Sequence, residues 1–260
     1  MTRAGQVYLI GAGPGDPELL TVRAQRLLQG AEIVVHDRLV SPDVLAVCPE
    51  TAIRISVGKA SACHPVPQDE INALLLTHAE QGRIVARLKG GDPLIFGRGS
   101  EEAAFLQSHG IEVHVVPGIT AAQGAASATG VPLTHRGLAG AVQYVTGHRQ
   151  AGQVLDLDWR RLADPDTTLV VYMGVANIGQ IAMGLMTAGL DPTTPVLAVA
   201  EATTPRERRL FSWLDKIAHD LRVAELEPPV LFMIGRVVSL YSETGVPQEM
   251  AASAMVSANA

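Results

Sequence analysis

Short runs of β-branched residues alternate with helical patterns through the first half of the chain. Strands are expected at residues 7–10, 32–36, 52–56, 83–88 and 111–116. Because a strand followed by a helix and a further strand pairs in parallel, this alternation predicts an α/β fold with a mostly parallel sheet. One intervening helix is expected to open at Pro17 and close at Gly30, and another to begin at Pro67 and end before Gly82.

The same kind of pattern restarts after the Gly/Pro/Thr-rich stretch at residues 130–140. Further strands are expected in VQYVT, TLVVY, PVLAVA, RRLFSW and PVLFMIG, and the closer spacing of the last ones indicates some antiparallel pairing. The sequence therefore predicts two α/β domains, residues 1–137 and 138–245, with a frayed tail at 246–260. A ligand cleft between the two sheets, lined by loops at the carboxyl ends of strands, is expected.

Charge and composition restrict the partners. The formal net charge of -6 creates no field that would attract nucleic acid or an anionic membrane, so neither partner is expected. No apolar stretch approaches the ~20 residues of a membrane span. The two cysteines, Cys48 and Cys63, are too few for a disulfide scaffold and lack metal-knuckle spacing, which favours the cytoplasm and no metal site.

A glycine-rich loop, GAGPGDPE at 11–18, lies between an expected strand and helix. A dinucleotide site is one interpretation, with Asp37 placed where a ribose-binding acid would lie. The G-x-G-P-G spacing and the carboxylate of Asp16 at the helix start oppose a pyrophosphate. A P-loop is excluded because Lys89 precedes the glycines of its own loop. A tight turn against a phosphate-free ligand and a purely structural turn both stay open.

Charged residues crowd a second loop, RLKGGDPLIFGRGSEE at 87–102. A solvated turn, with acidic residues placed at the positive end of the following helix, is the simpler interpretation. The concentration of charge beside glycines and a proline favours a ligand or catalytic site. The charged residues in question are Arg87, Lys89, Asp92, Arg98, Glu101 and Glu102.

These segments together resemble the tetrapyrrole methylase family, and most closely its uroporphyrinogen-III branch. The match extends over most of the chain in family order. The blocks that carry it are VYLIGAGPGDPELLT (7–21), AEIVVHDRLVS (31–41), VGK (57–59), HPVPQDEIN (64–72), RLKGGDPLIFGRGSEE (87–102), VVPGITAA (115–122), GVPLTHR (130–136), VTGH (145–148), YMG (172–174) and IGRVV (234–238).

The resemblance implies two α/β domains of the tetrapyrrole methylase type, with S-adenosylmethionine bound in an active-site cleft between them, and a homodimer. It also implies methyl transfer to carbons 2 and 7 of uroporphyrinogen III, which yields precorrin-2 for sirohaem or cobalamin synthesis and S-adenosylhomocysteine as coproduct. Enzymes that process precorrin-2 would be the downstream partners.

The resemblance also implies roles for single residues. The implied cofactor contacts are Pro14, Gly90, Gly91, Asp92, Ile95, Thr120, Ala121, Met173 and Ala202, the last being glycine in many family members. The implied catalytic residues are Asp37, Lys59, Arg98 and Glu101. The implied substrate-binding residues are Arg38, His64, Arg98 and Arg136.

The implied chemistry needs alignment more than a strong base, because the sulfonium already activates the methyl group. A polycarboxylate substrate requires local cations on an acidic protein, and Arg98, which stays protonated, suits anchoring. Asp37 and Glu101 suit the role of proton acceptor. Two other functions stay open: methylation of a later corrin intermediate or of diphthamide, and binding of a nucleotide or tetrapyrrole without turnover.

Overall fold

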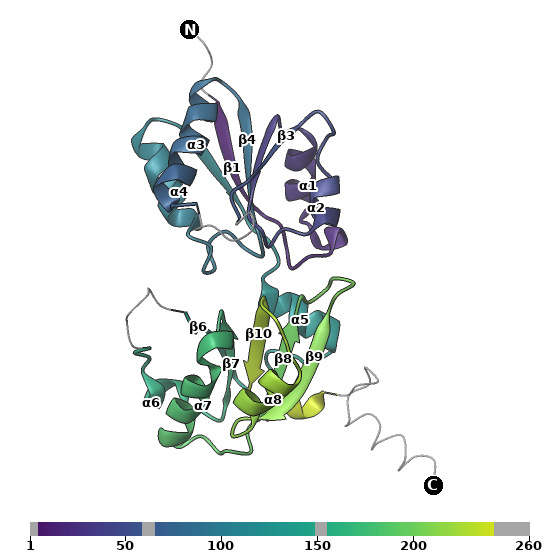
Figure 1. Ribbon diagram of the computed structural model, residues 1–260, viewed down its shortest axis with the longest axis vertical. Helices are drawn as coiled ribbons and strands as arrows, with labels where there is room; N and C mark the ends of the chain where they lie inside the picture. Colours follow the sequence, from purple (N-terminus) through teal and green to yellow (C-terminus); the bar gives the residue numbers. More distant parts are fainter. Residues whose placement is uncertain (1–4, 59–65, 149–154, 242–260) are drawn as a thin grey trace, which may run out of the picture. The chain divides into compact units, whose positions relative to one another are not determined.

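The first half of the chain folds around a five-stranded sheet in which every strand pair is parallel. The computed structural model describes residues 5–58, 66–148 and 155–241. The strands are β1 (Gln6–Gly11), β2 (Ile33–His36), β3 (Ile53–Ser56), β4 (Ile84–Lys89) and β5 (Glu112–Val116), in the spatial order β3-β2-β4-β1-β5 (Figure 1). The parallel sheet predicted from the βα alternation is confirmed.

Helices cover both faces of this sheet (Figure 1). On one face, α1 (Val22–Gln29) and α2 (Pro42–Ala46) pack over Ile10 and Leu88. On the other, α3 (Gln68–Glu80) and α4 (Gly99–Ser108) pack over Leu9 and Val85. Neighbouring residues of a strand point to opposite faces, so β1 and β4 serve two hydrophobic cores at once.

The helix expected to open at Pro17 begins later, so that prediction is wrong. Pro17–Leu19 forms a separate 3-10 turn, η1, capped by the Asp16 carboxylate, which accepts a hydrogen bond from the Glu18 amide at 2.9 Å. Thr21 then accepts from the Ala24 amide at 3.1 Å and starts α1 at Val22. Two capping side chains in close succession divide the segment. The helix predicted to follow Pro67 is confirmed as α3.

The second half of the chain has a mixed sheet in the order β6-β7-β10-β8-β9. Only β6 and β7 pair in parallel, whereas β7–β10, β10–β8 and β8–β9 are antiparallel, which confirms the antiparallel pairing predicted from the sequence. The strands are β6 (Ala141–Thr146), β7 (Thr167–Tyr172), β8 (Pro195–Ala200), β9 (Arg208–Trp213) and β10 (Val230–Ile234).

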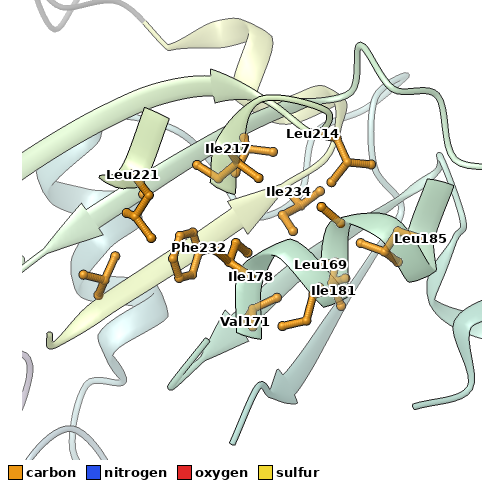
Figure 2. Packing of buried hydrophobic residues seen from close by; sticks show 14 of the residues in the cluster. Leu169, Val171, Ile178, Ile181, Leu185, Leu214, Ile217, Leu221, Phe232 and Ile234 are labelled. Carbon is orange, nitrogen blue, oxygen red and sulfur yellow. The ribbon is translucent and has the colours of Figure 1, made fainter. Parts of the chain in front are cut away.

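Phe232, on β10, lies within the core of this second sheet (Figure 2). It is fully buried among residues that include Val171 of β7, Ile178 of α7 and Leu221 of α8. The helices of this half are α5 (Ala121–Thr129), α6 (Trp159–Leu162), α7 (Ile178–Thr187) and α8 (Ile217–Val223), with 3-10 turns η2 (Val175–Asn177) and η3 (Arg236–Leu240). Among the described helices, none is long and apolar enough to cross a bilayer.

The chain divides into two compact units, Met1–Ala121 and Ala122–Ala260. Helix α5 is tied to the second unit, because the Ala122 amide donates to the Tyr172 hydroxyl at 3.2 Å and the Ala128 carbonyl accepts from Arg209 at 2.6 Å. The domain boundary predicted after Gly137 lies in the loop that follows α5.

Three loops of the first unit meet backbone against backbone at glycines. Gly13 and Gly91 exchange two hydrogen bonds, at 3.2 and 2.8 Å, and both have a left-handed φ. A methyl group on Gly11 would lie 2.5 Å from the amide nitrogen of Gly118, and one on Gly118 would collide with the Gly91 carbonyl oxygen. Only glycine allows this approach, so the backbones of these loops are in direct contact.

The substitution Gly118→Ala should therefore destabilise the first unit by about 1–3 kcal/mol, because backbone atoms must move to admit the methyl group. Denaturant unfolding monitored by circular dichroism would measure it. Gly30→Ala is the matched control, since a methyl there meets only ordinary contacts at 3.8 and 3.9 Å. Equal stability of the two variants would contradict the close approach.

Candidate active site

Four of the sequence blocks lie in loops at the carboxyl end of the first sheet. GAGPG follows β1, DRLV follows β2, GGDP follows β4 and PGITA follows β5. Since all five strands are parallel, these loops share one edge of the sheet, which is where α/β proteins bind ligands. The edge is the candidate active site of the first unit.

Asp92 holds two of these loops together. Its Oδ2 accepts a hydrogen bond from the Gly118 amide at 3.1 Å, and its Oδ1 accepts from the Leu94 amide at 2.8 Å. A methyl on Gly91 would be 3.7 Å from the Ala121 amide nitrogen and 3.9 Å from the Thr120 Cα, so these backbones are close neighbours. The structure thus brings together the predicted cofactor contacts Gly91, Asp92, Thr120 and Ala121.

The turn after GGDP is strained. Phe96 and Arg98 have φ of 53° and 57°, values that side-chain-bearing residues seldom adopt. The turn is closed by the Gly99 amide, which donates to the Pro93 carbonyl at 3.0 Å. Leu94, Ile95 and Phe96 leave their apolar side chains exposed. Left-handed residues of this kind gather at functional sites, and here they present an apolar rim at the carboxyl edge.

Asp37, the first residue after β2, is held by a cation from β4. The Arg87 Nη2 atom lies 2.6 Å from its Oδ1, and the Lys89 Nζ lies 3.9 Å from its Oδ2. Arg87 and Lys89 are almost fully buried, whereas the Asp37 side chain keeps 30% of its surface exposed. The carboxylate therefore connects a buried charge cluster to solvent.

Glu102 of α4 completes this buried cluster. Its Oε1 lies 3.2 Å from Arg87 Nη2 and 2.9 Å from Lys89 Nζ, and the side chain has no exposed surface. Burial lowers the pKa of Lys89, the charge of Arg87 lowers it further, and the charges of Asp37 and Glu102 oppose both effects. Two cations and two carboxylates thus balance one another inside the first unit.

The sequence interpretation gave Arg87, Lys89 and Glu102 no individual role. A usable signal existed, because residues two apart on a strand face the same side, and Arg87 and Lys89 alternate with the apolar Ala86 and Leu88. Two cations on one face of a central, buried strand require anions opposite them.

Arg98 and Glu101 form an exposed ion pair. Arg98 Nη2 lies 2.6 Å and Nε 3.0 Å from the two carboxylate oxygens of Glu101, in a bidentate arrangement. The hydrogen bond from Arg98 lowers the pKa of Glu101, and the same bond raises the pKa of Arg98. Both side chains are more than half exposed, so they are open to a ligand.

Arg38 and Leu39 are exposed in the loop after β2. Gly58 packs against the Arg38 backbone so closely that a methyl on it would collide there, and Gly90 lies against the Leu39 Cβ. Among the described residues Arg38 has neither an ion-pair nor a hydrogen-bond partner for its guanidinium. The loop therefore presents an uncommitted cation beside the candidate site.

In the second unit, the VTGH and YMG blocks lie side by side at the ends of the parallel strands β6 and β7. The Gly147 amide donates to the Tyr172 carbonyl at 2.7 Å, and a methyl on Gly147 would lie 2.6 Å from the Gly174 Cα. Met173 lies between these glycine contacts with a left-handed φ of 54° and 49% of its surface exposed. It is not a core methionine.

Arg136 lines a pocket of about 620 Å³ in the second unit, within the size range of small-molecule sites. Arg236 shares the pocket but is engaged by Asp166 and by the carbonyls of Pro165 and Leu138. Within the part of the chain that the structure describes, Arg136 has no such partner. The pocket thus offers one unengaged guanidinium.

The family model for Tetrapyrrole (Corrin/Porphyrin) Methylases matches residues 6–218. The chain belongs to this family. A uroporphyrinogen-III C-methyltransferase of Paracoccus denitrificans is 56% identical over 246 residues, which are 95% of this chain and 86% of that protein. A siroheme synthase of Chromobacterium violaceum is 50% identical over 92% of this chain but only 50% of its own length.

Solved structures similar to this chain include a methyltransferase that acts on a tetrapyrrole. The uroporphyrin-III C-methyltransferase of Thermus thermophilus, complexed with S-adenosyl homocysteine, has 47% identity and a TM-score of 0.78, and the match covers 91% of this chain and all of that one. The predicted fold, two α/β units of the tetrapyrrole methylase type, is confirmed.

The structure describes the backbone at Ala202, one of the positions implied by the family resemblance, but not at two others. Ala202, where many members of the tetrapyrrole methylase family have glycine, is not in the left-handed region, although its neighbours Glu201 and Thr203 are, with φ of 45° and 66°. Alanine therefore costs no backbone strain there. Lys59 and His64 lie outside the described residues, so their roles stay predictions.

The pKa of Glu101 tests whether the bidentate ion pair with Arg98 forms in solution. Substituting Arg98→Ala should raise the pKa of Glu101 toward its ordinary value, because the hydrogen bond that lowers it is lost. The carboxylate then protonates at higher pH, which an NMR titration of the glutamate and aspartate side-chain carboxyl carbons detects. Asp191, whose pKa is lowered by Thr193, serves as the control and should not change. An unchanged Glu101 pKa would mean that the ion pair does not persist in solution.

Proposed function

We propose that this chain is an S-adenosylmethionine-dependent C-methyltransferase that converts uroporphyrinogen III to precorrin-2 by methylation at carbons 2 and 7. The observation that carries the proposal is the carboxyl edge of the first sheet. There, glycine-packed loops without phosphate-binding features adjoin a carboxylate held by a buried arginine. The identity to a uroporphyrinogen-III C-methyltransferase supports the choice of substrate.

The loops suit a cofactor that carries no phosphate. The Glu18 amide, which would be available to a pyrophosphate in a dinucleotide-binding loop, already donates to Asp16. At Gly90 and Gly91 no side chain shields the backbone, so a ligand can approach the main-chain atoms closely. We assign the cofactor contacts of the first unit to Pro14, Gly90, Gly91, Asp92, Ile95, Thr120 and Ala121, and keep Met173 and Ala202 as those of the second.

When bound, S-adenosylmethionine supplies a methyl group activated by its sulfonium. The protein then has to orient the substrate, and arginines without internal partners are suited to bind its carboxylates. Within the described ranges Arg38 and Arg136 are such residues, and Arg98 can join them through its exposed guanidinium. The exposed apolar side chains of Leu94, Ile95 and Phe96 are suited to contact the apolar pyrrole rings of the substrate.

Methylation at a ring carbon requires that a proton be lost, and Asp37 is our candidate for the group that accepts it. Its exposed carboxylate edge faces solvent while Arg87 fixes the other side. Glu101 is the weaker candidate, because both of its carboxylate oxygens accept hydrogen bonds from Arg98, which lower its pKa, whereas Arg87 bonds only Oδ1 of Asp37. Lys59 stays a predicted partner in this proton transfer.

Assembly and location are included in the proposal on the strength of the family resemblance. We propose a homodimer in the cytoplasm that delivers its product to precorrin-2-processing enzymes. Light scattering coupled to size-exclusion chromatography tests the dimer: the mass of a single 27.4 kDa chain in dilute solution would contradict it.

Asp37→Asn should lower turnover about 100-fold or more while leaving S-adenosylmethionine affinity unchanged, because the residue handles a proton and does not contact the cofactor. Anaerobic assays with uroporphyrinogen III and calorimetric titration of the cofactor measure the two quantities. Asp43→Asn, an exposed carboxylate in the first turn of α2, is the control and should keep wild-type activity. Loss of cofactor affinity in Asp37→Asn would contradict the assignment.

Arg38→Ala and Arg136→Ala should each raise the KM for uroporphyrinogen III about 10- to 100-fold, the size expected for loss of one charge-assisted hydrogen bond. Steady-state kinetics at fixed ionic strength measure it. Arg23→Ala, which removes an exposed arginine of α1, is the control. A KM unchanged in both site variants would reject these anchors.

A methyl-transfer assay separates the proposed function from the alternative functions. A substrate panel with labelled methyl donor distinguishes a methylase for a later corrin or for diphthamide, because only the substrate that fits accepts label. A binding module would retain the cofactor and a ligand but would transfer no methyl group to any substrate of the panel.

A further inference from the structure

The buried charge cluster of the first unit has an organisation that packing alone does not require. Its four charged members are Asp37, Arg87, Lys89 and Glu102. Replacing a buried ion pair by apolar residues of similar volume is often neutral or stabilising, so a stable core does not need these charges. The cluster also ends at a partly exposed carboxylate, Asp37, at the edge that carries the proposed active site.

Arg87 connects the two carboxylates. Its Nη2 donates to Asp37 Oδ1 at 2.6 Å, while Nη2 and Nε both donate to Glu102 Oε1 at 3.2 Å. Nη1 donates to the Leu88 carbonyl at 3.3 Å, so each nitrogen of the fork has a partner. The guanidinium is therefore fixed in one plane, with the side chain 2% exposed.

Glu102 is the fixed end of this chain of contacts. A single oxygen, Oε1, accepts from Arg87, from Lys89 Nζ at 2.9 Å and from Gln68 Nε2 at 3.1 Å. Its other oxygen is buried without a hydrogen-bond partner among the described residues. The carboxylate is thus held by its cations on one side, which points it at Arg87 and Lys89.

Asp37 is the movable end. Its amide donates to the Leu88 carbonyl at 3.3 Å, which anchors its backbone to β4 but leaves its side-chain torsions free. The hydrogen bond from Arg87 Nη2 to Oδ1 restricts these torsions and so sets the direction of the carboxylate. A lysine at residue 87 would keep the charge but lacks the planar fork, so it would not fix the direction of its contacts to the two carboxylates.

We propose that Arg87, fixed in turn by Glu102, is a positioning residue that orients the Asp37 carboxylate for its role in methyl transfer. The inference rests on the proposed function, since it assigns to Asp37 the proton-accepting role given above. Arg87 is too deeply buried to touch substrate, so it acts through Asp37.

Arg87→Lys should lower kcat about 10- to 100-fold, the effect of a misplaced reacting group, with the KM for S-adenosylmethionine unchanged. Glu102→Gln should lower the same parameter by a smaller factor, because the amide keeps the volume and one acceptor oxygen. Arg83→Lys is the matched control: Arg83 pairs with Glu32 at 3.0 Å and is half exposed, so kcat should not change.

A double-substitution cycle tests whether Arg87 acts through Asp37. In an Asp37→Asn background, Arg87→Lys should alter kcat less than about twofold, because the group it orients is already lost. If the reduction in kcat of the double variant equals the product of the two single reductions, the inference is overturned. So would a wild-type kcat in both Arg87→Lys and Glu102→Gln.

The outcomes separate this inference from the function itself. A wild-type protein that methylates no tetrapyrrole rejects the proposed function. An active wild type in which Asp37→Asn keeps full turnover rejects the role of Asp37, and with it the inference. Thermal unfolding shows whether Arg87→Lys folds. If it does not, the cycle is run with Glu102→Gln in its place. A kcat of the double variant that is reduced by the product of the two single reductions overturns the inference there too.

Discussion

The contact of Gly11, Gly91 and Gly118 is the constraint on which the first unit depends. Parallel strands deliver their loops to one edge, but side chains would keep those loops apart. Glycine lets the loops after β1, β4 and β5 touch through their backbones, and Asp92 closes the contact by accepting from the Gly118 amide. The candidate cofactor residues are therefore placed by main-chain geometry.

The charge cluster beneath that edge depends on the same topology. Because β4 is the central strand, with β2 on one side and β1 on the other, its residues Arg87 and Lys89 lie under the loop that begins with Asp37. Helix α4 then places Glu102 opposite them. A central strand that would ordinarily be apolar thus carries two cations toward the site.

Much of the fold could be predicted from the sequence, because β-branched runs and their spacing report strands directly. The start of α1 could not, since Pro17 is as suited to the short turn η1 as to a helix, and the capping by Thr21 decides between them. Candidate site residues such as Asp37 and Gly91 were predicted from the blocks that resemble the family, and their roles stay predictions. The roles of Arg87 and Glu102 were not predicted, because which anion meets which buried cation depends on packing between elements distant in sequence.

The left-handed turn at Phe96 and Arg98 has a consequence for affinity. A loop that must adopt a rare backbone shape around its ligand loses conformational entropy at that moment, and the loss weakens binding. Here the hydrogen bond from Gly99 to Pro93 already holds the shape. Recognition can then proceed with little reordering of the main chain, so that rate and selectivity are set by the side chains that the turn displays.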